Sequence, residues 1–119
     1  MKNSINHLPE IKQEELQKIV KIIQKSCKDV EKIILFGSYA RGDYKEAKDI
    51  KPHSKYGHIS DYDILVVTEK KETALDSVLW SRISARLQVE GFSAYPKVIT
   101  HDIFELNKKL SEGQYFFSD

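Results

Sequence analysis

Apolar residues recur at three- and four-residue steps in the first part of the chain, which is the spacing of one buried face of an α-helix. The positions that share this spacing are Ile11, Leu16, Ile19, Val20 and Ile23. Pro9 precedes them, and glutamates stand near the start, where the helix dipole favours negative charge. The pattern predicts an amphipathic helix over roughly residues 9–26.

Two shorter, mostly apolar runs predict strands. The first covers residues 30–36, is almost continuously apolar from Ile33, which is typical of a strand buried on both faces, and stops at the dipeptide Gly37-Ser38. The second covers residues 64–67 and is entered through "SDYD". After the first run, "SYARGD" fits a short helix that begins near Ser38 and ends at Gly42.

Residues 43–59 carry mostly polar or turn-forming side chains, including Pro52 and Gly57, and predict a long loop. A long loop inside a compact domain is often functional or disordered. A lid, a partner contact and an ordinary solvated loop are all open interpretations of this segment.

The last part of the chain predicts further alternating elements. Residues 69–72 read as a charged turn, and residues 73–90 show a second helical spacing of apolar residues. The sequence "FSAYPKVIT" over 92–100 predicts a third strand, and Pro96 within it indicates an edge position or a bulge. A short helix is expected over residues 103–110.

Helices alternate with strands and no internal repeat or linker is evident, so we expect an α/β (α+β) fold in which helices flank a mixed β-sheet, as a single domain over residues 1–119. The 119 residues are 40% apolar and 31% charged, which is ordinary for a globular protein. The formal net charge of +1 does not support a broad nucleic-acid-binding surface, although it leaves room for a local basic patch.

The single cysteine, Cys27, cannot form an internal disulfide and is expected to be a small apolar residue near a helix end. No apolar run is long enough for a membrane span and no signal-peptide pattern is evident, so a cytoplasmic location is expected. The four histidines and the cysteine lack the close spacing of structural zinc ligands.

Asp61 and Asp63 stand where the second apolar run begins. Residues two apart on a strand point to the same face, with α-carbons about 6.6 Å apart. Two carboxylates at this spacing can bind one divalent cation or bridge a pair of them. Mg²⁺ is the ion that takes one or two carboxylates and completes its shell with phosphates and water. A solvated turn is the alternative interpretation, but a turn needs no second acid inside the strand.

The dipeptide Gly37-Ser38, at the end of a strand and the start of a helix, can offer backbone N–H groups and a hydroxyl to a phosphate. Arg41, one turn further on, could add a charged contact. A simple strand-to-helix turn with Ser38 as its cap is the alternative. The sequence has neither a P-loop nor a Rossmann glycine pattern.

"LFGSYARGD" followed by "SDYDILVV" resembles the nucleotidyltransferase superfamily that includes DNA polymerase beta, and looks most like its minimal, HEPN-associated members. The resemblance implies that Gly37, Ser38 and Arg41 bind a nucleoside triphosphate, such as ATP, and that Asp61 and Asp63 are catalytic and bind Mg²⁺. It implies transfer of a nucleoside monophosphate, such as AMP, to a hydroxyl of a protein or RNA.

The sequence departs from the family pattern in two places. The segment between Ser38 and Asp61 is longer than in the compact family form. The third carboxylate expected on the next strand is not evident: Lys97 takes the aligned position, while His101 and Asp102 are expected past the strand end. A bulge at Pro96 could bring Asp102 into the site. If Asp102 or Glu90 reaches the aspartates, transfer is favoured; if Lys97 stands there, nucleotide binding alone is favoured.

The chain finishes with an aromatic cluster at residues 115–117, which either folds back on the core or docks on another domain or subunit. The resemblance implies an all-helical HEPN domain or toxin–antitoxin partner. A non-catalytic nucleotide-binding or antitoxin-like module is therefore the alternative function. An aminoglycoside nucleotidyltransferase is disfavoured by the near-neutral charge and the lack of a helical substrate domain.

Overall fold

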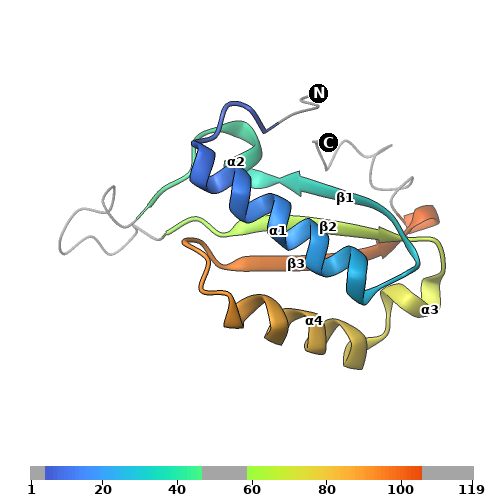
Figure 1. Ribbon diagram of the computed structural model, residues 1–119. Helices are drawn as coiled ribbons and strands as arrows, with labels where there is room; N and C mark the ends of the chain where they lie inside the picture. The colour runs from blue at the N-terminus through green and yellow to red at the C-terminus, as the bar shows by residue number, and fades with distance from the viewer. Residues whose placement is uncertain (1–4, 47–58, 106–119) are drawn as a thin grey trace.

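The computed structural model describes residues 5–46 and 59–105 of the chain. Figure 1 shows helices packed against a three-stranded sheet, which confirms the expected class of fold. The elements in chain order are α1 (Glu10–Ser26), β1 (Val30–Phe36), α2 (Gly37–Arg41), β2 (Tyr62–Thr68), α3 (Lys71–Ala74), α4 (Ser77–Val89) and β3 (Pro96–Asp102).

The sheet has the order β1-β2-β3, with β2 antiparallel to β1 and parallel to β3. Because β1 runs against the other two strands, its C-terminal end lies beside the N-terminal ends of β2 and β3. Figure 1 shows α2, the start of β2 and the loop before β3 at this same end of the molecule. Residues from three separate parts of the sequence therefore meet there.

The central strand β2 is buried on both faces, as its continuous apolar sequence predicted. On one face, Tyr62, Ile64 and Val66 pack in a cluster that includes buried residues of α1 and α4. On the other face, Leu65 and Val67 pack with residues of β1 and β3. Burial of a large apolar side chain contributes roughly 1.5–3 kcal/mol, so β2 is a firm support for the residues at its start.

The predicted bounds of α1 and β1 agree closely with the structure, and Cys27 is buried just beyond α1. The single helix predicted over residues 73–90 is wrong, because α3 ends at Ala74 and α4 begins at Ser77. The side chain of Asp76 caps α4 by accepting a hydrogen bond of 3.1 Å from the Leu79 N–H. This local cap starts a new helix where the apolar spacing alone continued.

The third strand also differs from its prediction. It begins at Pro96, an edge position where the missing N–H costs no ladder bond. Its register with β2 is continuous from the Tyr62–Pro96 pair to the Thr68–Asp102 pair, so the bulge considered at Pro96 is absent. The strand reaches Asp102, so the expectation that His101 and Asp102 lie past its end is wrong.

Three predictions concern residues outside the described parts. Most of the loop predicted over 43–59 lies there, as does the aromatic cluster at 115–117. Of the helix predicted over 103–110, the structure describes residues 103–105, which are helical. Within the described ranges, no helix combines the length and the apolar character that crossing a membrane requires.

A partly buried polar network joins α1 to the start of β2 and to the loop before β3. The carboxylate of Glu15 accepts hydrogen bonds from the Tyr62 hydroxyl (2.5 Å), the Ser93 N–H (2.8 Å) and the Ser93 hydroxyl (2.5 Å). Burial alone would raise the pKa of Glu15, but the bonds from Ser93 and Tyr62, together with Lys12, hold it below its usual value. The network therefore stabilises the ionised carboxylate.

Lys12 completes this network, although lysine is seldom so deeply buried. Its ammonium donates to the Ser93 hydroxyl at 2.5 Å and lies 5.6 Å and 5.8 Å from the ring centroids of Tyr39 and Tyr62. Tyr39 stacks on Tyr44 with centroids 4.2 Å apart, and burial, then the charge of Glu46, raises the pKa of Tyr39 to about 12. The network thus also holds α2, the helix that contains Tyr39.

Replacing Tyr62 with phenylalanine tests this support. Tyr62→Phe removes one donor from an ionised, partly buried carboxylate, so we expect a loss of about 1–2 kcal/mol in the free energy of unfolding by urea titration. The matched control is Tyr95→Phe, because the Tyr95 hydroxyl is near the surface with one long contact of 3.4 Å to Gln88. An equal effect of the two substitutions would contradict the role of the Glu15 bond.

Candidate nucleotide-binding site

The carboxylate of Asp63 lies directly against Gly37. Asp63 pairs with Phe36 across β1 and β2, so the residue after Phe36 lies beside the aspartate. A Cβ atom built on Gly37 would stand 2.3 Å from Asp63 Oδ2, closer than any real contact, and Gly37 has a φ of +72°. The structure therefore brings together the two sequence motifs, and glycine at position 37 is required both for space and for backbone conformation.

Asp61 and Asp63 flank Tyr62, whose ring is fully buried in the core on the α1 side. Both aspartates are half-buried, and Asp61 lies one residue before the strand begins. Burial raises the pKa of Asp63, Lys97 and Arg41 lower it, and Asp61 raises it further; the net shift is upward. Negative charge at this position is thus under-compensated, which is the condition that favours a bound cation.

Lys97 is the residue of β3 that pairs with Asp63. Paired residues of parallel strands point to the same face, and the charge of Lys97 acts on Asp63. The position at which the family pattern expects a third carboxylate is therefore occupied by lysine in this sheet. Within the described residues, no lysine or arginine forms an ion pair with either aspartate.

The other candidates for a third acid lie elsewhere. Asp102 pairs with Thr68 at the opposite end of β2, about 16 Å from Asp63 at the usual rise per residue, and points to the other face. Glu90 forms ion pairs with Lys18 of α1, at 2.5 Å, and with Arg86 of α4. The structure therefore does not bring Asp102 into the site, and the charge of Glu90 is compensated by its own partners.

Ser38 and Arg41 belong to α2, the short helix that the sequence predicted. Ser38 is half-buried, and its carbonyl accepts hydrogen bonds from the N–H groups of Gly42 and Asp43 at 2.8 Å and 3.1 Å. The exposed Arg41 side chain pairs with Asp43 at 3.3 Å. Exposed pairs of this kind contribute little, so the arginine can exchange Asp43 for a stronger anion at small cost.

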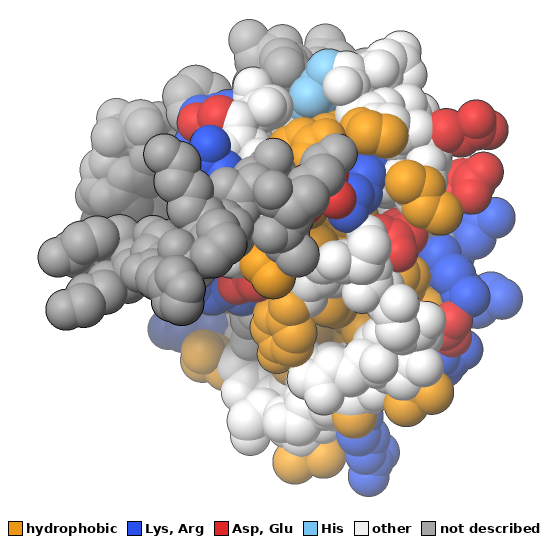
Figure 2. Space-filling view, turned by 90° about the vertical axis from the view of Figure 1, so that its left-hand side faces the viewer, with side chains coloured by type: hydrophobic (Ala, Val, Ile, Leu, Met, Phe, Trp, Pro, Cys, Tyr) orange, Lys and Arg blue, Asp and Glu red, His pale blue; other side chains and the backbone are white. Residues whose placement is uncertain are grey.

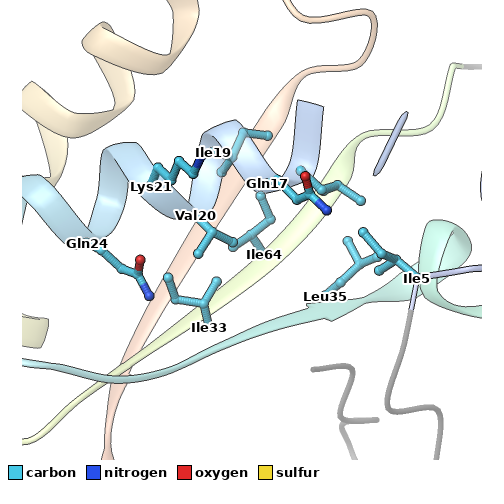
Figure 3. Close-up of a pocket in the computed structure, with 10 residues that line it drawn as sticks. Ile5, Gln17, Ile19, Val20, Lys21, Gln24, Ile33, Leu35 and Ile64 are labelled. Atoms are coloured by element: carbon cyan, nitrogen blue, oxygen red, sulfur yellow. The ribbon is translucent and has the colours of Figure 1, made fainter. Parts of the chain in front are cut away.

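The surface around the aspartates differs from the apolar cavity found elsewhere in the molecule. Figure 2 looks onto the end of the molecule that holds α2 and the start of β2, where hydrophobic and acidic side chains lie next to each other. A separate cavity of about 390 Å³ lies between α1 and the β1 side of the sheet. Figure 3 shows Ile33, Leu35 and Ile64 facing α1 there, and no acidic side chain lines it, so this cavity is not the site of the aspartates.

Comparison with known proteins agrees with this geometry. Residues 17–114 match the family model described as "Polymerase beta, Nucleotidyltransferase". The chain belongs to this nucleotidyltransferase family. Neither the curated proteins nor the solved structures contain a match. The family match confirms the resemblance at the level of the superfamily and supports a transferase-type function.

Nucleotidyltransferases generally use divalent metal ions, and the donor set of this chain fits one such ion in part. Asp61 and Asp63 are neighbouring carboxylates whose negative charges are not fully compensated. They suit a hard cation that takes its remaining ligands from phosphates and water. Within residues 5–46 and 59–105, no cluster of three or more acidic, histidine or cysteine side chains could hold a metal by itself. The substrate would therefore have to supply further ligands.

The sequence alone did not reveal the network of Lys12, Glu15 and Ser93 that holds the start of β2 in place. Glu15 and Ser93 are 78 residues apart in the chain, and Lys12 is one of many lysines in the sequence. A buried lysine and a half-buried glutamate on a helix give no local signal in the sequence. The three-dimensional contact is the only evidence that connects them.

Substitution of Gly37 tests the contact with Asp63. Gly37→Ala adds both left-handed backbone strain and a collision, whereas Gly91→Ala adds strain alone, because Gly91 has a φ of +67° and no atom lies within 4 Å of the point where its Cβ would stand. We expect Gly91→Ala to cost about 1 kcal/mol in the free energy of unfolding and Gly37→Ala at least twice as much. Equal losses would show that Asp63 does not press on Gly37.

Substitution of Asp63 tests its electrostatic environment. The folded-state pKa of Asp63 is raised, so its ionised form opposes folding at pH values above that pKa. We expect Asp63→Asn to raise the melting temperature at pH 7 without metal by roughly 2–5 °C. The difference should disappear as the pH falls below the usual carboxylate range, because both side chains are then neutral; a lower melting temperature at pH 7 would contradict the assignment.

Proposed function

We propose that this nucleotidyltransferase domain binds a nucleoside triphosphate, ATP in the first instance, together with Mg²⁺, and transfers its nucleoside monophosphate to a hydroxyl of a protein or RNA. The observation that carries the proposal is the contact between the Asp63 carboxylate and Gly37. This contact brings the Gly37-Ser38 turn, which could bind phosphate, next to Asp61 and Asp63. The family of this chain carries out this class of reaction.

The roles of the residues follow from their positions. The backbone N–H groups and hydroxyl at Gly37-Ser38 would hold the phosphates, and Arg41 would exchange its exposed partner Asp43 for a phosphate oxygen. Asp61 and Asp63 would hold the divalent ion. When bound, such an ion neutralises charge on the phosphates and orients them for displacement.

In the transfer itself, the acceptor oxygen forms a bond to the α-phosphorus, and the bond from that phosphorus to the oxygen bridging to the β-phosphate breaks. Pyrophosphate leaves with the electron pair, and the hydroxyl proton passes to solvent. Asp61, just before the start of β2, would accept a hydrogen bond from the incoming hydroxyl. Lys97 would reduce the negative charge that accumulates near Asp63.

A second function is favoured by one observation: Lys97 pairs with Asp63 where the family pattern expects a carboxylate. Without a third acid, the same corner would bind Mg²⁺ and nucleotide but transfer slowly or not at all. The domain would then act as a nucleotide-binding or antitoxin-like module. A HEPN-type helical protein is the proposed partner in either case, and the motif resemblance supports it.

The proposal is tested first by binding. In calorimetric titration with Mg²⁺ and a non-hydrolysable ATP analogue, we expect Asp61→Asn and Asp63→Asn to weaken binding at least 30-fold, because each removes a ligand of the ion. Chelation of Mg²⁺ should have the same effect on the natural sequence. The control is Glu31→Gln, which removes an exposed charge from β1. Binding that survives both aspartate substitutions would refute the proposed site.

Transfer is tested second, with ATP labelled in the α-phosphate and an extract from which protein and RNA are recovered separately. Label in either fraction, absent with Asp63→Asn, supports the transferase, and the labelled fraction identifies the class of acceptor. If only the Lys97→Asp variant transfers label, the domain of natural sequence is the non-catalytic module. Pyrophosphate release gives an independent readout.

A further inference from the structure

A second cavity lies beside Asp61, on the β3 side of the site. Its volume is about 510 Å³, within the range of small-ligand pockets. It is an open hollow bordered by the C-terminal end of α4, the loop before β3 and the residues that lead into β2. The side chains used in the argument are Ile59, Asp61, Gln88, Phe92 and Tyr95.

The cavity lies across the aspartates from the Gly37-Ser38 corner. The corner follows β1, the aspartates begin β2, and the cavity reaches Pro96 at the start of β3, in the order β1-β2-β3 across the sheet. Strands are about 4.8 Å apart, so the corner and the cavity flank the aspartates on opposite sides. Figure 1 shows all three strand ends at one end of the molecule.

This arrangement matches the geometry of in-line displacement. Attacking and leaving oxygens lie on opposite sides of the transferred phosphorus. If the leaving pyrophosphate is held at Gly37-Ser38, the acceptor hydroxyl must approach from the β3 side. The nucleoside departs from the phosphorus roughly perpendicular to that line, so the cavity lies where the acceptor, and not the nucleotide base, is expected.

The lining indicates the chemistry of the occupant. Ile59 and Tyr95, which are 48% and 50% exposed, both line the cavity, and Phe92 adds a second ring. Gln88 and the Tyr95 hydroxyl provide polar groups 3.4 Å apart. Among the described residues that line the cavity none is basic, and the one charged group is the Asp61 carboxylate. A flat apolar group fits this lining, whereas a phosphate would find no basic side chain among these residues.

The wall of the cavity is fixed before any ligand binds. Both the N–H and the hydroxyl of Ser93 donate to Glu15, and Lys12 donates to the same hydroxyl. The Tyr95 carbonyl accepts from the Tyr62 N–H at 2.8 Å, which ties the loop to the strand of the aspartates. Such pre-organisation lowers the entropic cost of binding.

We propose that this cavity is the acceptor site, and that it takes an uncharged planar ring which carries or adjoins the acceptor hydroxyl. The assignment rests on the proposed transferase function and makes it more specific, because it excludes an acceptor that places a phosphate beside Asp61. The ring can belong to a phenol or to a terminal nucleoside.

The test uses the full chain saturated with Mg²⁺ and a non-hydrolysable ATP analogue, with phenol, uridine and phenyl phosphate titrated separately by NMR. We expect phenol or uridine to shift the amide signals of Phe92 and Tyr95, and phenyl phosphate to bind at least tenfold more weakly than phenol. The tighter of the first two ligands identifies the source of the ring.

Tyr95→Ala should weaken ring binding at least fivefold, and Tyr95→Phe should retain it. Val89→Ala is the control, because Val89 is 81% exposed on α4 and does not line the cavity.

The outcomes separate the two proposals. If neither ring compound binds, if Tyr95→Ala has no effect, or if phenyl phosphate binds best, the acceptor assignment is overturned. If Tyr95→Ala instead weakens binding of the ATP analogue itself, the cavity belongs to the nucleotide and the assignment is again overturned. Failure of the natural sequence to bind the ATP analogue contradicts the proposed function, and it is measured before any ring compound is added.

Discussion

The close approach of the Asp63 carboxylate to Gly37, which leaves no space for a Cβ atom there, is the constraint on which the site depends. It needs glycine at position 37, and it needs the antiparallel register in which Phe36 pairs with Asp63. A shift of one residue in that register would turn Asp63 to the opposite face and expose the ring of Tyr62. The site therefore depends on strand pairing. The two motifs lie side by side only because the end of β1 pairs with the start of β2.

The two neighbouring aspartates reduce the free energy of unfolding, and contacts in the surrounding structure offset this loss. Asp63 is partly buried beside Asp61, an arrangement that opposes folding whenever both are ionised. Between them, Tyr62 turns the other way, with its ring in the core and its hydroxyl on Glu15. Side chains alternate between the two faces of a strand, so Asp61 and Asp63 can point to the site while Tyr62 packs in the core. Such a division of roles is expected where function requires a locally unfavourable arrangement.

Periodicity in the sequence predicted α1, β1 and the buried central strand well, because each has a long and consistent apolar pattern. It failed where a single local interaction outweighed the pattern, as at Asp76, whose cap divides one predicted helix into two. The residues of the two motifs could be found because each stands at the end of an apolar run. Glu15 and Ser93 could not, since a contact across 78 residues leaves no trace in local spacing. The position of Asp102 also required the register of β3, which only the structure provides.

Lys97 changes the charge balance of the site in a way that bears on its chemistry. With a carboxylate in that position, three acids would face one another, and two divalent ions would be needed to neutralise them and bridge the reacting oxygens. With Lys97 opposite Asp63 in the register of β2 and β3, the side chains of Asp61, Asp63 and Lys97 together carry a single formal negative charge. That charge suits one divalent ion, with phosphates and water as its remaining ligands. In the proposed reaction, the positive charge of Lys97 would also stabilise the negative charge that develops on the transferred phosphate, and this would offset part of what a third carboxylate contributes.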